Sequence, residues 1–320
     1  SLLPLTTSLK ENDTLYEKND IEDIKMISER YDDMTKQRDD LEKAKSDLET
    51  IIKDLTMKME QKFNECFEQI RSNFQTIFRE LFGGGRADIM LAGGAEAAVC
   101  YVGVGGFNSM HALSTRNDDA QGASRPFSKS RDGFVIGEGG ACLVLEEYEH
   151  AVARGAKIYA EIAGTGLSAD AYHMTAPLPN GEGAAKVMQY ALEEAGLKPE
   201  DIDYINTHGT STYAGDIAEV SAIKTVFGEH AYKLNISSTK SMTGHLLGGA
   251  GALEAVLTVL SVKNDIVPPT INHADGDEDE KIDYNLNFTF NKAQERVVNA
   301  AISNTFGFGG HNTSIAFKKI

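Results

Sequence analysis

Two histidines, His208 and His245, lie in loops that are rich in hydroxyl residues and glycines. The loops read Asn206-Thr207-His208-Gly209-Thr210-Ser211-Thr212 and Ser238-Thr239-Lys240-Ser241-Met242-Thr243-Gly244-His245. Each follows an apolar, strand-like run, at residues 202–205 and 234–236. Fixed hydrogen-bond donors stabilise negative charge where it develops in a reaction. The pattern therefore predicts a site in which two imidazoles converge on one negatively charged or polarised group.

Glycine-rich stretches at residues 103–106, 137–140 and 307–310 are further candidate ligand loops. The first two lack the Gly-Lys-Ser/Thr ending of a phosphate loop, and neither shows the dinucleotide-binding glycine pattern. They are therefore interpreted as turns or sites of close packing. The third, Gly307-Phe308-Gly309-Gly310, follows the apolar run 297–302. Two interpretations of it stay open, an oxyanion hole or a tight turn.

The elements that must position these loops belong to residues 87–320. Strand patterns occur at residues 87–91, 141–145, 157–163, 202–206, 233–237 and 299–303, and helical patterns at 183–196, 215–228 and 248–263. Such alternation predicts an α/β domain, a mostly parallel sheet with covering helices. The apolar runs 87–91 and 141–145 predict buried strands.

Residues 1–86 instead predict a long α-helical coiled-coil segment. Apolar residues recur there at alternating three- and four-residue intervals, namely at Ile24, Ile27, Tyr31, Met34, Leu41, Leu48, Ile52, Leu55 and Met59. Arg38 and Lys45 interrupt this seam. After a phase shift of about one residue, the stripe continues from Phe63 to Leu81, and the glycines at 83–85 are expected to end the helix.

Composition narrows the class of protein. The 320 residues are 41% hydrophobic, which is enough for a core, and no apolar run approaches the ~20 residues of a membrane helix. The net charge of -17 argues against a nucleic-acid-binding surface. The three cysteines lack metal-ligand spacing, which predicts no metal site and a cytoplasmic protein.

Residues 87–320 resemble the β-ketoacyl-acyl-carrier-protein synthases, closest to the type II elongating condensing enzymes of fatty-acid synthesis. The matching stretches are Ala-Gly-Gly-Ala-Glu (92–96), Leu-Ser-Thr-Arg-Asn-Asp (113–118), Ser-Arg-Pro-Phe (124–127), Arg-Asp-Gly-Phe-Val (131–135), Leu-Glu-Glu-Tyr-Glu-His-Ala (145–151), Asp-Ala-Tyr-His-Met-Thr (170–175), the two histidine loops and Asn-Thr-Phe-Gly-Phe-Gly-Gly (304–310). The resemblance implies a thiolase-like fold of two similar halves. Residues 87–320 then form a partial domain that lacks most of the N-terminal half.

The reaction that the resemblance implies is decarboxylative Claisen condensation in fatty-acid elongation, an acyltransferase activity. By resemblance, His208 and His245 bind the malonyl thioester carbonyl and stabilise the enolate. Lys240 matches a lysine that orders the site, which we expect it to do by pairing with Glu254.

The remaining site residues by resemblance contact the substrate arm. Thr210 and Thr212 match hydroxyls that bind phosphopantetheine, Phe306 matches a gating phenylalanine, and Phe308 begins the turn beside the oxyanion region. The expected partner is acyl-carrier protein, which carries the phosphopantetheine, so no cofactor of the chain's own is expected.

The acyl-accepting nucleophile of the family has no counterpart in this sequence. That cysteine lies in an Ala-Cys-Ser/Thr turn at a helix N-terminus, where the thiolate is favoured, and no such turn occurs here. Cys66 lies in the coiled-coil stripe, Cys142 in the run 141–145, and Cys100 downstream of the nucleophile's expected place. Impaired condensation is therefore expected. The alternative is an inactive fusion or a coiled-coil interaction module.

Residues 20–88 have a resemblance of their own, to the C-terminal coil that enters the head of bacterial chromosome-partition SMC proteins. It rests on Arg-Asp-Asp-Leu-Glu-Lys-Ala-Lys-Ser-Asp-Leu (38–48) and Phe-Arg-Glu-Leu-Phe-Gly-Gly-Gly-Arg-Ala-Asp (78–88). The signature and Walker B strand of that ATPase head do not follow, so a chimera of two unrelated genes is expected. The coil and the uncovered face of half a condensing fold both predict self-association.

Overall fold

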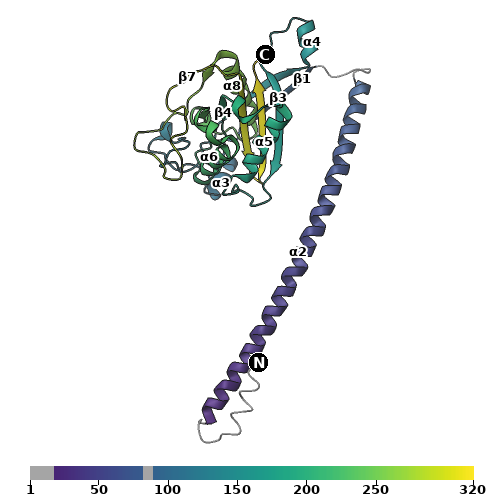
Figure 1. Ribbon diagram of the computed structural model, residues 1–320, viewed down its shortest axis with the longest axis vertical. Helices are drawn as coiled ribbons and strands as arrows, with labels where there is room; N and C mark the ends of the chain where they lie inside the picture. The colour runs from purple at the N-terminus through teal and green to yellow at the C-terminus, as the bar shows by residue number, and fades with distance from the viewer. Residues whose placement is uncertain (1–17, 82–88) are drawn as a thin grey trace. The chain divides into compact units, whose positions relative to one another are not determined.

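The computed structural model describes residues 18–81 and 89–320, and the chain divides into two units, Ser1–Arg86 and Ala87–Ile320. The first unit contains helix α2 (Lys18–Leu81), a single helix of 64 residues (Figure 1). The large apolar side chains of the predicted seam from Ile27 to Leu55 are exposed on it. The side chains of the stripe at residues 63–81 and the glycines at 83–85 lie outside the described part of the chain. The coiled coil itself stays a prediction.

The main sheet of the second unit has five strands in the order β3-β9-β8-β4-β5. The strands are β3 (Glu161–Ala169), β4 (Tyr204–Asn206), β5 (Asn235–Ser237), β8 (Ala300–Gly307) and β9 (His311–Lys318). β4 runs parallel to β5 and β8, whereas β9 is antiparallel to both β3 and β8. The prediction of a mostly parallel sheet was therefore wrong, and the sheet is mixed. The cause is β9, which the sequence patterns missed.

The turn from β8 to β9 explains that difference. Only antiparallel neighbours can be joined by a few residues, since a parallel pair needs a crossover connection. Gly309 and Gly310 have φ of 84° and 78°, and the Gly310 N–H donates to the Gly307 carbonyl oxygen at 3.2 Å. Because L side chains rarely adopt such φ values, the glycine run at 307–310 forms a tight turn that reverses the chain.

Helices cover both faces of this sheet. Helices α5 (Glu182–Ala195) and α6 (Tyr213–Phe227) pack with Ile205, Ile236 and Ile302 on one face, and helix α8 (Ala250–Asn264) packs with Tyr204, Ala301 and Phe317 on the other. Successive strand residues point to opposite faces, so each strand feeds both layers. The three predicted helices and the four predicted strands of this sheet are present, with ends shifted by a few residues.

A second, two-stranded antiparallel sheet consists of β1 (Ile89–Glu96) and β2 (Gly139–Glu146). Leu143 packs into the α8 cluster, but the paired residues Leu91 and Val144 are 72% and 61% exposed. The prediction of buried strands was wrong for these two, because the described chain covers only one face of this sheet.

Short elements complete the unit, namely α3 (Tyr101–Ser109), α4 (Tyr148–Ala153), α7 (Lys240–Thr243), β6 (Ile266–Val267), β7 (Gln294–Glu295) and the 3-10 turns η1 (Ala120–Gly122), η2 (Pro199–Asp201), η3 (Gly228–Tyr232) and η4 (Leu247–Gly249). Among the described helices of the whole chain, none combines the length and apolar character of a membrane span.

Candidate active site

Adjacent parallel strands bring the two histidine loops together. His208 follows β4 and the Ser238 loop follows β5, and the carboxyl ends of parallel neighbours meet at one edge of a sheet. Ser238 Oγ donates to the Gly209 carbonyl oxygen at 2.6 Å, which ties the loops to each other. The rings of His208 and His245 lie 5.2 Å apart between centroids and are nearly perpendicular, at 87°. The predicted convergence of the two imidazoles is present in the structure.

A buried carboxylate on helix α6 fixes the backbone of the first loop. The N–H groups of His208 and Gly209 donate to the two oxygens of Glu219 at 2.9 and 2.8 Å. Asn304 Nδ2 on β8 donates to the same carboxylate at 3.1 Å. Burial raises the pKa of Glu219, while these three donors lower it. One side chain thus joins the loop, the helix and the central strand.

Both imidazoles are neutral at pH 7. Burial lowers the pKa of His208 well below its usual value, and the positive charge of Lys240 lowers it further. Burial, with Lys240 as the second cause, lowers the pKa of His245 to about 3. The Leu247 N–H donates to His245 Nδ1 at 3.3 Å, so that nitrogen is an acceptor and the proton of the neutral ring resides on Nε2. His245 is therefore a neutral N–H donor.

The ammonium of Lys240 on α7 contacts the carboxylate of Glu254 on α8, the ion pair that the resemblance implies. Both side chains are almost fully buried. Burial raises the pKa of Glu254 and the ammonium lowers it. Neither residue lines the cavity beside the histidines, and Lys240 influences them through its charge, which lowers the pKa of both. The role of Lys240 in ordering the site stays a prediction.

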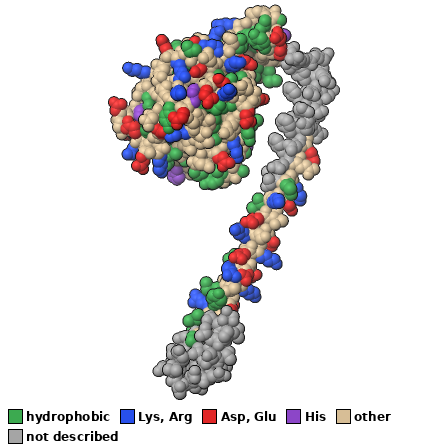
Figure 2. Space-filling model, viewed as in Figure 1, with side chains coloured by type: hydrophobic (Ala, Val, Ile, Leu, Met, Phe, Trp, Pro, Cys, Tyr) green, Lys and Arg blue, Asp and Glu red, His purple; other side chains and the backbone are tan. Residues whose placement is uncertain are grey.

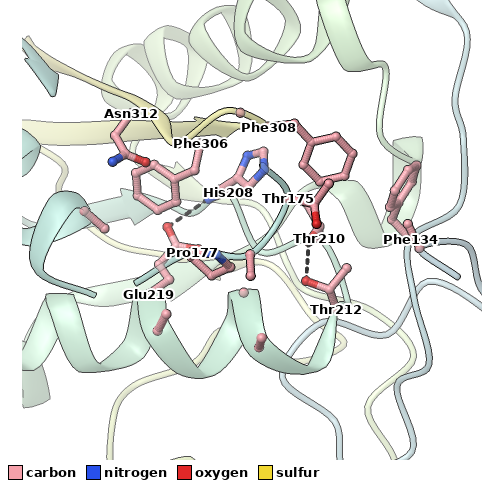
Figure 3. Close-up of a pocket in the computed structure, with 18 of the residues that line it drawn as sticks. Phe134, Thr175, Pro177, His208, Thr210, Thr212, Glu219, Phe306, Phe308 and Asn312 are labelled. Carbon is pink, nitrogen blue, oxygen red and sulfur yellow. Dashed lines mark hydrogen bonds between the residues drawn. The ribbon is translucent and has the colours of Figure 1, made fainter. Parts of the chain in front are cut away.

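A cavity of about 480 Å³ opens beside the two histidines. His208 and Phe306 lie next to each other in it, with ring centroids 5.5 Å apart. Phe308 and Phe134 line the cavity on the same side of His208 as Thr210 (Figure 3). Its lining includes all the predicted site residues except Lys240 and Glu254. The hydroxyls of Thr210 and Thr212 face each other at 3.0 Å. The cavity is thus mainly apolar and has a few polar groups, which is typical of a small-molecule site.

Sequence reasoning missed several residues that form this cavity. Phe134 contacts the edge of the His245 ring, with centroids 5.3 Å apart, and Phe107 contacts Phe134 at 5.4 Å. Asp170 and Asn312 line the cavity and are joined by a 2.7 Å hydrogen bond. Phe134 and Asp170 lie in stretches that match the family, so a signal existed for them. Nothing in the sequence pattern distinguishes Glu219 from other acidic residues on helices.

The described cysteines lie away from the histidines. Cys100 precedes α3 and Cys142 lies on β2; both are exposed, and neither lines the cavity. Cys66 has no described side chain. Among the residues that the structure describes, no thiol is placed to act with the two imidazoles.

Similarity to known proteins is found over the second unit and the last ten residues of the first unit. Residues 159–274 match the family "Beta-ketoacyl synthase, C-terminal domain", and residues 77–151 match "Beta-ketoacyl synthase, N-terminal domain". The chain is 54% identical to 3-oxoacyl-[acyl-carrier-protein] synthase 2 of Synechocystis sp. over 239 residues, which is 75% of this chain and 56% of that protein. It is 52% identical to the enzyme of the same name from Staphylococcus aureus over 235 residues, 73% of this chain and 56% of that protein.

Solved structures give the same result. A β-ketoacyl synthase from Burkholderia phymatum is 43% identical, with a TM-score of 0.69 over 78% of this chain and 58% of its own. A type II PKS ketosynthase solved with its acyl-carrier protein is also 43% identical, with a TM-score of 0.71 over 74% of this chain and 57% of its own. The chain spans about 56% of the length of the curated relatives it matches. Its C-terminal part is homologous to the β-ketoacyl synthases, the 3-oxoacyl-[acyl-carrier-protein] synthase 2 enzymes among them, and has their thiolase-like ketosynthase fold.

Proposed function

We propose that the second unit provides the histidine half of a β-ketoacyl-acyl-carrier-protein synthase site and that this half decarboxylates malonyl thioesters. The observation that carries the proposal is the pair of neutral imidazoles, 5.2 Å apart, on a cavity of about 480 Å³. Homology to the condensing enzymes of fatty-acid synthesis supports the choice of substrate.

The chemistry follows from where charge develops. When the bond between the carboxylate carbon and the α-carbon of a malonyl thioester breaks, carbon dioxide leaves and the electron pair moves onto the thioester oxygen. The His245 Nε2–H and the His208 ring are the groups placed to stabilise that enolate oxygen. Hydrogen-bond donors that are already in position stabilise it without reorganisation at the moment of reaction. A proton from water on the α-carbon then completes an acetyl thioester.

Acyl-carrier protein is the proposed partner, and its phosphopantetheine is the proposed occupant of the cavity. One of the similar structures is a ketosynthase in complex with its acyl-carrier protein. The facing hydroxyls of Thr210 and Thr212 are suited to the amide groups of the arm, and the rings of Phe306 and Phe308 to its alkyl portions. We infer no resident cofactor or metal and a cytoplasmic location.

Full condensation also needs a cysteine nucleophile, and no described thiol lines the cavity. We therefore propose impaired acyl transfer and condensation, unless another polypeptide supplies the thiol. The exposed seam of α2 favours a second candidate role as an interaction module. Together with this second role, we propose that residues 20–88 have an SMC-type origin and that the chain is therefore a chimera.

The test is carbon dioxide release from malonyl-acyl-carrier protein labelled at the free carboxylate. The intact chain should release label, and His208→Ala should lower the rate about 10²–10³-fold. His311→Ala is the control, since His311 is an exposed histidine that lies outside the cavity lining. Release equal in the intact chain and in His208→Ala would refute the proposal.

A further inference from the structure

Helix α2 presents an unpartnered apolar seam. In heptad notation its a positions are residues 24, 31, 38, 45 and 52, and its d positions are 27, 34, 41, 48 and 55. The large apolar residues at these positions from Ile27 to Leu55 are at least 53% exposed, and Figure 2 shows apolar side chains among charged ones along the helix. A helix with such a seam is stabilised chiefly by packing against another helix.

The five d positions are all apolar, namely Ile27, Met34, Leu41, Leu48 and Leu55. The cations of the seam both lie at a positions, as Arg38 and Lys45. In a parallel, in-register pair of identical helices, each a residue faces its own copy, so Arg38 would face Arg38 and Lys45 would face Lys45. Like charges facing each other in a partly desolvated seam repel.

Flanking charges do not offset that repulsion. In a parallel pair each g position contacts the e position five residues on in the partner. From residue 30 to residue 56 these contacts are Arg30–Thr35, Gln37–Glu42, Ala44–Glu49 and Ile51–Thr56. None of them joins opposite charges, so a parallel pair gains no ion pair across this interface.

An antiparallel pair removes the conflict, because each a position then faces a d position of the partner. One register uses every described seam residue from 24 to 55, and its layers are Ile24–Leu55, Ile27–Ile52, Tyr31–Leu48, Met34–Lys45 and Arg38–Leu41. Each seam cation meets an apolar side chain, along whose surface its alkyl stem can pack while its charge stays in water. The seam is therefore complementary to itself in this orientation.

We propose that α2 forms a two-stranded antiparallel coiled coil with α2 of a second copy of this chain, with its two-fold axis near residues 39 and 40. This pairing goes beyond the proposed activity and does not depend on it. Ser28 then lies beside Glu49 of the partner. The two copies of Ser28 lie about 23 residues apart along the axis, or about 35 Å at a rise of 1.5 Å per residue.

The experiment uses the full chain with its three cysteines replaced by serine. Sedimentation first establishes that this background still dimerises. Spin labels are then placed on Ser28→Cys alone, on Glu49→Cys alone, and on an equal mixture of the two variants. The proposal predicts separations of roughly 30 Å or more in each single variant, and a short separation that appears only in the mixture.

A pair of double variants tests the physical reason. Arg38→Leu with Lys45→Leu removes the seam cations, so dimerisation should strengthen and a short Ser28–Ser28 separation should appear as parallel pairs form. Lys36→Leu with Lys43→Leu makes the same change in charge at two f positions away from the seam, and should leave orientation unchanged. Three results would overturn the proposal. The cysteine-free chain could be a monomer, the Ser28→Cys or Glu49→Cys variant alone could show a short separation between spin labels, or the distances could be broad because the chains associate through the other unit.

Discussion

Replacing Lys240 by methionine should destabilise the α/β unit by about 3–5 kcal/mol, the usual cost of removing one partner of a buried ion pair. Lys240 and Glu254 are 1% and 2% exposed, so solvent screens them little. The second carboxylate oxygen of Glu254 is buried and has no hydrogen-bond partner in the described structure. Without the ammonium, Glu254 must therefore stay as an uncompensated charge or take up a proton.

The effect should depend on pH in a defined direction. Burial raises the pKa of Glu254, and losing Lys240 raises it further. A carboxyl group whose folded-state pKa lies above its unfolded value destabilises the fold as pH rises through that folded value. The stability difference between Lys240→Met and the parent should therefore be largest near pH 7 and should narrow toward pH 5. Lys240→Met with Glu254→Met should restore most of the loss, because the unpaired charge is gone.

Urea unfolding at fixed protein concentration measures these differences. Tyrosine fluorescence is the probe, since the chain has 11 tyrosines and no tryptophan. Lys292→Met, which removes an exposed lysine, is the matched control and should change stability by less than about 0.5 kcal/mol. The reasoning is refuted if Lys240→Met unfolds like the parent, or if the double variant is as unstable as the single one.

Three further predictions concern the site itself. The pKa of His245 is lowered to about 3 in the folded chain, against an unfolded value near 6.5. Its contribution to stability is therefore present above pH 6.5 and is lost as pH falls toward 3. Urea unfolding at several pH values should show that the parent loses stability more steeply with acid than His245→Gln does. Glu219→Gln turns an amide N–H₂ toward a backbone donor and should lower carbon dioxide release about tenfold or more, with Glu229→Gln as the exposed control. Thr210→Val should raise KM for malonyl-acyl-carrier protein several-fold with kcat little changed; a fall in kcat alone would contradict an arm-binding role.

The sequence by itself determined the longer helices, most of the strands and both histidine loops. These features are local: apolar periodicity defines α5, α6 and α8, and short motifs of hydroxyls and glycines mark the loops around His208 and His245. A motif states which residues lie near one another along the chain. Because two such motifs each follow a strand-like run, they were sufficient to predict that two imidazoles share a site.

Only the tertiary structure decided how that site is held together. Glu219 binds the His208 loop from a helix 11 residues further along the chain, and Phe134 reaches His245 from a separate loop. The direction of β9 and the exposure of Leu91 and Val144 likewise depend on which segments pair and which faces the described chain covers. Burial also set the protonation of both histidines, because desolvation depends on the surrounding atoms and not on the residue type.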